Sequence, residues 1–375
     1  MPGGIMAYTS IRYRAYPNKK QEALFEKTFN ATCFIWNKML EDKKNIYLRE
    51  RKITRITPTH YKKEYNWLTE VDSHALANVQ INIERSFNHL IKKKKFPNYK
   101  SKKCAKKSYT TNLVGSNIRF RNKSIRLPKA GFVKIALHRK APENWTLKTV
   151  TVSQEPSGKY YISVLYEDPS YITITADTNK SIGLDFAMHG LYVDSNGKCA
   201  EMPRFMKLSN EKLQKARRRL SKMYVKGKKK QSNRYYKQKH RVAILHEKIR
   251  NQRRDWLHKH SKMLIDKYDY IGIEDLNMVA MRKSLNFGRV VNDNAWSKFT
   301  VMLMYKAAKE GKHVIKVNRR FPSSQMCHRC GSINPNTKNL SIREWNCPVC
   351  GTHHQRDINA ALNIKAEAIR IIMQN

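Results

Sequence analysis

The sequence predicts a multidomain α/β protein, and three observations point to this fold class. Residues 21–47 and 73–90 carry apolar side chains at helical spacing, so the first region is expected to be largely helical. From residue 108 to about residue 171 the apolar pattern has a period of two, which is typical of β-strands. After residue 181, strand-like runs alternate with helical runs, which predicts an α/β layer.

Local signals place the elements of the first half of the chain. Residues 5–16 alternate as a strand does, and Asn18 is suited to cap the helix that follows. Residues 91–107 are rich in lysine and are expected to form a loop. Turn residues such as Gly158 separate the strands expected in the β region. These strands are 117–127, 132–138, 148–154 and 159–166.

In the second half, residues 169–180 are expected to be a linker before the α/β layer. Residues 208–264 form a long, highly basic stretch with helical character, and Asp357 opens the final helix. The remaining elements expected are strands at 181–186, 191–193, 268–276 and 313–317, a turn at 195–198, and a helix at 294–311.

The charge of the chain favours a polyanionic partner. Its 375 residues include 75 Lys and Arg against 29 Asp and Glu, a formal net charge of +46, which favours binding to nucleic acid. A membrane surface is the rival polyanion, but no run reaches the ~18 apolar residues of a membrane span. Residues 1–10 lack the features of a secretory signal. Cys33, Cys104 and Cys199 are scattered, as free thiols of a reducing cytosol are.

Two cysteine pairs near the C-terminus have the spacing of a zinc site. Cys327-x2-Cys330 is followed after sixteen residues by Cys347-x2-Cys350, which is the pattern of a four-cysteine zinc ribbon. Four thiolates fill a tetrahedron and leave no open position. The Zn²⁺ expected here is therefore structural.

Three acids lie in or beside apolar segments. Asp185 and Glu274 belong to strand-like runs, and Asp357 stands at the start of an amphipathic helix. Buried carboxylates are costly unless they are paired or bind metal, and Mg²⁺ prefers such oxygen ligands. Singly, each acid has an ordinary explanation: a helix cap for Asp357, a lysine partner for Glu274, a strand end for Asp185. Strand alternation is expected to point the neighbouring Asp275 to the other face.

The basic stretch within 208–264 is the main candidate for a nucleic-acid surface. Residues 215–230 contain nine Lys and Arg and no acid, and tyrosines such as Tyr224 are interspersed. A charge run can be a solvated helix face, but the lack of acids favours contact with phosphates. The residues expected to make this contact are Arg217, Arg218, Arg219, Lys228, Lys229 and Lys230. With the three acids, this predicts a metal-dependent nuclease.

Taken together, these motifs resemble the TnpB family of transposon-encoded, RNA-guided DNA endonucleases, which are related to type V CRISPR effectors. The resemblance covers nearly the whole chain. Its most specific blocks are Phe321-Pro-Ser-Ser-Gln, the two cysteine pairs and Arg356-Asp357-Ile-Asn-Ala-Ala-Leu-Asn-Ile, in that order. Other blocks are Arg14-Ala-Tyr-Pro-Asn, Trp67-Leu-Thr-Glu-Val-Asp, Gly183-Leu-Asp185, Ile273-Glu274-Asp-Leu and the segment from Trp296 to Tyr305-Lys-Ala-Ala.

The resemblance implies a fold for each part of the chain. Asp185, Glu274 and Asp357 match the three acids of a RuvC-type nuclease with an RNase H-like fold. The resemblance implies that these acids bind two Mg²⁺ ions. The implied divisions are a β-barrel-like wedge domain (1–16 and 108–178), a helical recognition domain (17–107), the RuvC nuclease domain (179–318 and 352–375) and the zinc ribbon as a target-nucleic-acid-binding insert (319–351).

The resemblance also implies the activity and the partners. Members bind a guide RNA, recognise a transposon-adjacent motif in double-stranded DNA, open an R-loop and cut both strands. A monomer in a cytoplasmic, nucleoid-associated ribonucleoprotein of a prokaryote is expected. Ser73, His74, Ala77, Val114 and Gly115 match positions that face the adjacent motif. Gln355 departs from the Asp often found before Arg356-Asp357.

Three alternatives remain open from the sequence. A non-catalytic zinc-ribbon protein, acting as an accessory factor or repressor, would explain the charge and the cysteines but leave the carboxylates without a role. A protein-guided transposase or junction resolvase would cut DNA without RNA. A small type V CRISPR effector is the nearest alternative within the same class.

Overall fold

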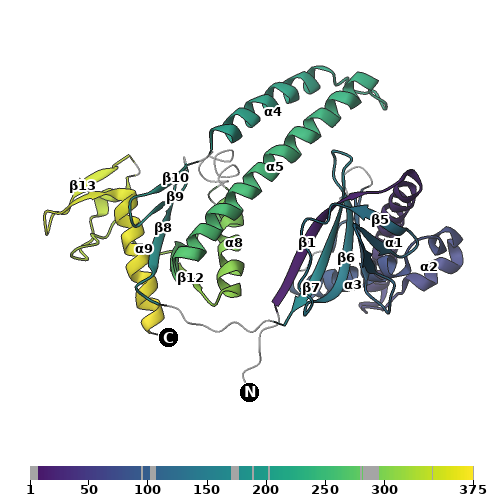
Figure 1. Cartoon of the computed structure of the whole chain (residues 1–375), viewed down its shortest axis with the longest axis horizontal. Helices are drawn as coiled ribbons and strands as arrows, with labels where there is room; N and C mark the ends of the chain where they lie inside the picture. The colour runs from purple at the N-terminus through teal and green to yellow at the C-terminus, as the bar shows by residue number, and fades with distance from the viewer. Residues whose placement is uncertain are drawn as a thin grey trace. The chain divides into compact units, whose positions relative to one another are not determined.

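The structure is a computed structural model that describes residues 7–93, 96–101, 107–169, 177–187, 190–201, 203–278, 281, 295–339 and 341–374. The chain divides into two compact units, Met1–Ser170 and Tyr171–Asn375 (Figure 1). Cys104 and most of the expected linker 169–180 lie outside the described residues. Within the described part of the chain, no helix has the length and apolar character needed to span a bilayer.

The helices of the first unit confirm the predicted helical region. Asn18 and Gln21 form a reciprocal capping box that starts helix α1, as expected of the Asn cap. Apolar side chains of α1 and α3 face one another and bury a core that includes Ile35, Leu76 and Ile83. The short helices between them were not predicted. The helices are α1 (Lys19–Glu50), α2 (Pro58–Glu64), the 3₁₀ turn η1 (Asn66–Thr69) and α3 (Ser73–Lys93).

The first unit also contains a seven-stranded antiparallel sheet in the order β2-β6-β7-β1-β5-β4-β3. Its strands are β1 (Ala7–Tyr16), β2 (Ser108–Asn112), β3 (Arg119–Arg121), β4 (Ser124–Leu127), β5 (Gly131–Ile135), β6 (Thr146–Gln154) and β7 (Tyr160–Asp168). The single strand predicted at 117–127 is wrong, because Asn122 has φ of 51° and turns the chain into the β3–β4 hairpin. Phe25 and Phe29 of α1 pack on this sheet.

The second unit is built on a five-stranded mixed sheet in the order β10-β9-β8-β11-β12. The first three strands form an antiparallel meander, while β8, β11 and β12 run parallel to one another. The strands are β8 (Ser181–Phe186), β9 (Gly190–Asp194), β10 (Cys199–Glu201), β11 (Tyr270–Glu274) and β12 (His313–Val317). Strand β10 was not predicted.

Within the described residues of this unit, the helices are α4 (Arg204–Lys222), α5 (Asn233–Lys267), α8 (Trp296–Lys309) and α9 (Arg356–Met373). The helical stretch predicted at 208–264 is confirmed over most of its length, but it forms two helices rather than one. The chain turns back between α4 and α5 at a loop where Gly227 has φ of 85°, and the two helices form a hairpin that projects from the sheet (Figure 1). The zinc-ribbon region contains the 3₁₀ turn η2 (Pro335–Lys338) and strands β13 (Glu344–Asn346) and β14 (His353–Gln355).

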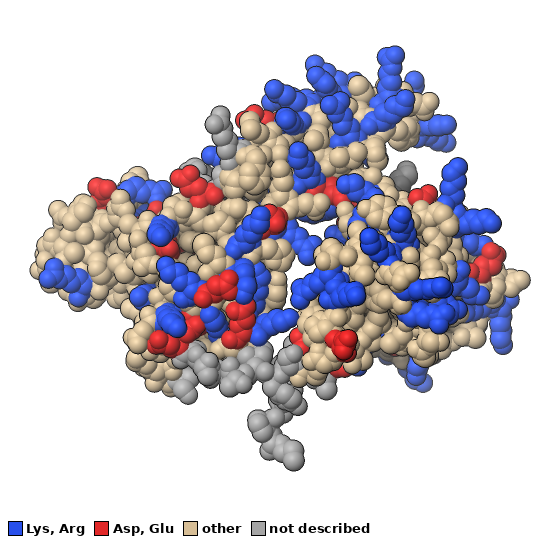
Figure 2. Space-filling model, in the orientation of Figure 1, with Lys and Arg blue, Asp and Glu red and all other residues tan. Residues whose placement is uncertain are grey.

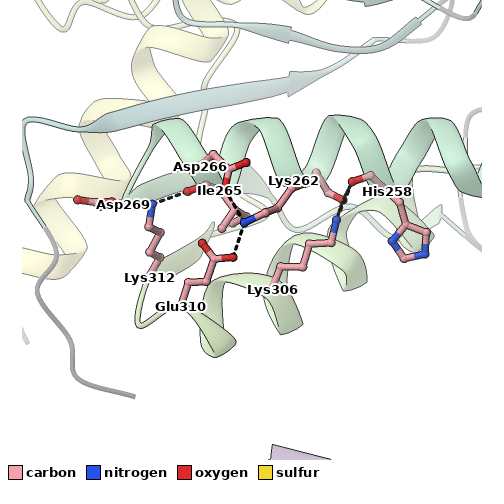
Figure 3. Close-up of polar contacts among 9 residues, drawn as sticks. His258, Lys262, Ile265, Asp266, Asp269, Lys306, Glu310 and Lys312 are labelled. Carbon is pink, nitrogen blue, oxygen red and sulfur yellow. Dashed lines mark hydrogen bonds and ion pairs between the residues drawn. The ribbon is translucent and has the colours of Figure 1, made fainter. Parts of the chain in front are cut away.

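Helices α5 and α8 cover one face of the sheet. Phe299, Leu303 and Leu264 pack with the apolar strand residues Leu184 and Ile273. Lysines at the edge of this interface tie the two helices together (Figure 3). Lys306 donates to the carbonyl of His258 at 2.6 Å, and Lys262 pairs with Glu310 at 2.7 Å. Beyond the ends of the helices, Lys312 pairs with Asp269 at 3.0 Å.

Helix α9 covers the opposite face, where two glycines make room for it. Gly183 and Gly272 are register partners on the neighbouring strands β8 and β11. A Cβ at Gly272 would lie 2.8 Å from the carbonyl oxygen of Ile364, and one at Gly183 would lie 2.6 Å from the backbone nitrogen of Lys365. Both atoms belong to α9, so the helix backbone rests directly on the sheet.

We expect Gly183→Ala to lower the free energy of unfolding by about 3 kcal/mol, because the added methyl group meets helix backbone that cannot rotate away. Gly227→Ala is the comparison, since its Cβ would meet no atom within 4 Å and only its positive φ opposes the change. That variant should lose about 1 kcal/mol or less. Chemical denaturation monitored by circular dichroism measures both, and equal losses would contradict the close contact of α9.

Candidate metal and carboxylate sites

The four cysteines predicted to bind zinc converge on one point. The Sγ atoms of Cys327, Cys330, Cys347 and Cys350 all lie within 4.8 Å of one another. Cys327 and Cys347 are buried, whereas the other two are exposed. Gly331 and Gly351 follow the pairs with φ of 77° and 68°, which closes two equivalent turns. This donor set and spacing fit one tetrahedral Zn²⁺.

Neighbouring polar groups prepare these thiols to act as ligands. The hydroxyl of Ser332 lies 3.1 Å from the sulfur of Cys347 and, ahead of backbone donors, lowers the pKa of that thiol to about 6. Burial instead raises the pKa of Cys327 to about 11. Nε2 of the buried His354 lies 3.1 Å from the Cys327 sulfur, so it can donate to that thiolate when metal is bound.

Two asparagines of helix α9 fasten the ribbon to the rest of the second unit. Asn359 donates to the carbonyl of Met326 at 2.8 Å and accepts from the backbone N–H of His328 at 3.0 Å. One turn later, Asn363 donates to the carbonyls of Ser323 and Met326 at 2.8 and 2.6 Å. Both asparagines are almost fully buried. They explain why amides interrupt an otherwise apolar helix face.

The three acids of the predicted nuclease site come from three elements that meet at one edge of the sheet. Asp185 in β8 and Glu274 in β11 each stand two residues after the glycines on which α9 rests, so they share that face. Asp357 precedes Ala361 by four residues, or about one turn, and the Ala361 carbonyl is the atom nearest to a Cβ at Gly183. Asp357 is therefore carried over the ends of the two strands.

The acids act on one another electrostatically. The pKa of the Asp185 carboxyl is raised well above its ordinary value, first by burial and then by the negative charges of Glu274 and Asp357. Burial also raises the pKa of Glu274, against the lowering effect of its hydrogen bond from Ser323. Asp185 therefore lies within electrostatic reach of both other acids.

The ordinary explanations of Asp357 and Glu274 find little support in the structure, whereas Asp185 does lie near a strand end, one residue before β8 ends. Gln355 is the N-cap of α9 and α9 has no side-chain cap bond, so Asp357 is not a capping residue. Within the described residues, Glu274 and Asp185 form no ion pair with lysine or arginine. The ion pair of Asp357 among these residues is a long contact of 3.4 Å to the exposed Arg343. As expected, Asp275 is engaged elsewhere, in an ion pair with Arg319 at 2.8 Å.

Sequence reasoning missed three side chains that surround the acids. Ser323 donates to Glu274 at 2.9 Å, and Arg343 approaches Asp357. The buried Arg356 lowers the pKa of both Asp185 and Glu274 and donates to the carbonyl of Asn339 at 3.1 Å. Ser323 and Arg356 lie within the family-like sequence blocks, but nothing in those letters indicates which acid each one serves.

The structure brings together the residues predicted to face a DNA motif. Asn78 of α3 donates to the carbonyl of Thr110 and to the side-chain oxygen of Asn112, both at 3.0 Å, which joins the start of α3 to the end of β2. Ser73, His74 and Ala77 lie on that first part of α3, while Val114 and Gly115 lie in the exposed turn after β2. Their contact with nucleic acid stays a prediction.

The basic residues predicted to bind nucleic acid are all exposed. Arg217, Arg218 and Arg219 lie on α4, and Lys228, Lys229 and Lys230 lie in the loop of the hairpin. Figure 2 shows Lys and Arg side chains concentrated over this hairpin. Exposure makes them available to phosphates, and which nucleic acid they contact stays a prediction.

Comparisons with known proteins place the chain in a family. Residues 161–285 match a family model described as "Probable transposase" (OrfB_IS605), and residues 296–364 match "Cas12f1-like, TNB domain". Residues 6–52 match a model described as "Helix-turn-helix domain", although here this segment contains a strand and one long helix.

The chain is also similar to whole curated proteins. It is 33% identical to a "Putative RNA-guided DNA endonuclease" of Streptomyces pristinaespiralis, over 96% of this chain and 89% of the relative. It is 28% identical to "Putative RNA-guided DNA endonuclease InsQ" of Escherichia coli K12, over 95% and 91%. The chain belongs to the TnpB family.

A solved structure supports the fold of this TnpB-family chain. The Cas12f1 protein in a cryo-EM structure of a Cas12f1-sgRNA-target DNA complex aligns with a TM-score of 0.62, over 96% of this chain and 99% of that one. The sequence identity is 14%, so the likeness concerns the fold. The predicted mixed α/β class is confirmed at this level.

We expect the TnpB-family chain to bind one Zn²⁺, and Cys347→Ser to lose it, because three thiolates leave the tetrahedron incomplete. Elemental analysis of the purified protein by mass spectrometry measures the zinc content. Cys199→Ser is the matched control, since Cys199 is an exposed free cysteine outside the cluster and its loss should leave zinc bound. Equal zinc contents in the two variants would contradict the site.

Proposed function

We propose that this protein is an RNA-guided DNA endonuclease that binds a guide RNA, recognises a short motif in duplex DNA, opens an R-loop and cuts both strands with a single Mg²⁺-dependent site. Membership of the TnpB family and the names of the full-length relatives support this assignment. In this proposal the protein acts as one copy per ribonucleoprotein, in the cytoplasm of a prokaryotic cell at its nucleoid.

The domains follow the same proposal. Residues 1–16 and 108–178, which include the strands β1 to β7, are the wedge domain, and residues 17–107, which include the helices α1 to α3, are the recognition domain. Residues 179–318 and 352–375 form the RuvC-type nuclease domain. The ribbon at 319–351 binds target nucleic acid. The β10-β9-β8-β11-β12 order, with its antiparallel meander beside parallel strands, supports an RNase H-like fold for the nuclease domain.

One observation carries the catalytic assignment: Asp185 and Glu274 share one face of the sheet near the ends of their strands, and burial, followed by the negative charges of Glu274 and Asp357, raises the pKa of Asp185. Such a cluster is unfavourable for the protein alone. It becomes favourable when divalent cations neutralise it, and carboxylate oxygens are the ligands that Mg²⁺ prefers. The residues therefore fit the ions that the family is expected to use.

The roles of the side chains follow from their contacts. Bound Mg²⁺ supplies charge neutralisation and makes water a stronger nucleophile at neutral pH. Ser323 holds the Glu274 carboxylate in one orientation through its 2.9 Å hydrogen bond. The buried Arg356 keeps positive charge beside Asp185 and Glu274, which favours their ionised forms. The products expected from attack by water are a 5′-phosphate and a 3′-hydroxyl.

The remaining candidate residues bind nucleic acid in this proposal. Ser73, His74, Ala77, Val114 and Gly115 contact the adjacent DNA motif, which suits their shared place on the first unit. The basic residues of the α4–α5 hairpin contact phosphates. A formal charge of +46 fits a protein that holds both a folded RNA and an RNA–DNA heteroduplex.

We expect Asp185→Ala, Glu274→Gln and Asp357→Asn each to abolish cutting of a guide-matched plasmid, because each removes a ligand oxygen or its charge. Binding of the guide RNA should stay within about twofold of the unmodified protein, since the basic residues expected to contact RNA lie on α4 and the hairpin loop, whereas the acids lie on β8, β11 and α9. Asp275→Asn is the matched control: it alters the adjacent acid, which pairs with Arg319, and should keep cutting.

The same assay separates the alternatives. Loss of cutting after ribonuclease treatment of the complex is expected for a guided nuclease, whereas a protein-guided transposase or resolvase would continue to cut. No cutting by the unmodified protein with its co-purifying RNA and Mg²⁺ would favour a non-catalytic binding protein. Retained cutting by Asp185→Ala would refute the carboxylate site.

The raised carboxyl pKa values predict a pH dependence of metal use. Asp185 and Glu274 stay protonated at pH values above their ordinary pKa values of 3.8 and 4.5. Mg²⁺ must displace those protons when it binds. At subsaturating Mg²⁺ the cutting rate should therefore rise with pH above this range, and the Mg²⁺ concentration for half-maximal rate should fall.

A rate series at several Mg²⁺ concentrations between pH 5.5 and 8.5 tests this dependence, the range being about one to four units above the ordinary pKa of a carboxyl group. Asp275→Asn provides the control, because its acid is exposed and paired and should leave the profile unchanged. A half-maximal Mg²⁺ concentration that does not change with pH would contradict proton release from these acids.

A further inference from the structure

The loop that joins α4 to α5, residues 223–232, has a fixed shape despite its exposure; it is called the hairpin tip below. The buried side chain of Gln231 accepts from the backbone N–H of Val225 at 2.9 Å and donates to the carbonyls of Val225 and Lys228 at 2.8 and 3.1 Å. Ser232 caps α5 through the backbone N–H of Tyr235. One glutamine therefore closes the loop on both sides of Gly227.

The hairpin tip holds apolar and aromatic side chains in water. Tyr224 is 56% exposed and Val225 is 48% exposed, and Tyr236 on the adjoining first turn of α5 is 44% exposed. The rings form a group, with centroids 6.1 Å apart for Tyr224 and Tyr235 and 5.5 Å apart for Tyr235 and Tyr236. A preformed aromatic group on an exposed loop is typical of a contact surface.

The charge around this group identifies the kind of partner. Between residues 212 and 246 the chain has fourteen Lys and Arg and no Asp or Glu. The hairpin tip contains four lysines, all of them exposed: Lys226, Lys228, Lys229 and Lys230. Figure 2 shows this concentration of positive side chains over the hairpin. Aromatic rings beside dense positive charge suit a polyanion with flat apolar faces, which is nucleic acid with unpaired bases.

We propose that the hairpin tip binds an unpaired loop or bulge of RNA, with Tyr224 stacking on a base and Lys228, Lys229 and Lys230 contacting the flanking phosphates. Gln231 is a positioning residue that holds the backbone of Val225, next to Tyr224. Unpaired RNA is favoured over paired nucleic acid because bases within a duplex keep their faces stacked on one another, and proteins read RNA mainly at splayed-out bases. The choice of RNA rests on the proposed function, which supplies a folded guide.

The test uses the full-length protein without added Mg²⁺, so that binding is measured apart from cutting. The probes are a fluorescent RNA stem-loop with 2-aminopurine in its loop and a fully paired RNA of the same length. We expect Tyr224→Leu to weaken binding of the stem-loop about fivefold or more and to abolish the quenching of 2-aminopurine by stacking. Tyr224→Phe keeps a ring and should stay within about twofold.

Two further variants separate stacking from charge. The combined change Lys228→Gln, Lys229→Gln and Lys230→Gln should weaken both RNAs and reduce the salt dependence of binding, because fewer counterions are released. Tyr224→Leu should leave the salt dependence and the paired RNA unchanged. Gln231→Ala should reduce the quenching although the ring is present, since the loop is no longer held.

The proposal is overturned if Tyr224→Leu binds the stem-loop as the unmodified protein does, or if it weakens the paired RNA equally. Equal binding of a DNA stem-loop, with the same loss in Tyr224→Leu, would assign the hairpin tip to a DNA strand and overturn the choice of RNA. If Tyr224→Leu weakens stem-loop binding but the unmodified protein never cuts DNA, only the proposed nuclease activity is refuted. Failure of the hairpin-tip proposal and failure of the proposed function are therefore distinguishable.

Discussion

The close seating of helix α9 on two paired glycines is the constraint on which the candidate nuclease site depends. Gly183 and Gly272 are register partners, so together they open one flat area across β8 and β11. Helix α9 approaches there until its backbone lies against the strands. The acids follow the glycines by two residues on the strands, and Asp357 precedes the contact by one turn on the helix. The absence of side chains at the two glycines thus sets where the three acids lie.

This arrangement makes the site electrostatically unfavourable and mechanically rigid at once. Burial and like charge raise the pKa of Asp185, and a flexible site would relieve that repulsion by letting the carboxylates separate. Helix α9 cannot move away without uncovering the apolar residues around Ile364, which is fully buried with Val317 and Ala368. Arg356 compensates only part of the negative charge, since it serves two acids and a backbone carbonyl. The remaining negative charge is what a cation would neutralise.

The sequence predicted those parts of the fold and site that depend on local patterns. The apolar strand around Asp185, the paired cysteines and the Asn18 cap each contain their signal within a few residues, and the structure has the strands, the cysteine cluster and the capping box. The break in the helical stretch predicted at 208–264 was missed because fold-back at Gly227 requires packing between α4 and α5, involving Leu213 and Ile249, which no local period reveals. Ser323 was missed for a similar reason, since its partner Glu274 lies far away in sequence.

The link between the zinc ribbon and the carboxylates shows how distant motifs act together. Asn363 holds the backbone of Ser323 and Met326, Ser323 holds Glu274, and Met326 immediately precedes the first cysteine of the cluster. Hence folding of the ribbon around a bound Zn²⁺ would restrain the residue that orients a catalytic candidate. Since Asn359 and Asn363 share the helix that carries Asp357, one element positions both the ribbon and the third acid. A structural zinc can therefore influence the geometry of the carboxylates without contacting them, through the backbone of 323–328.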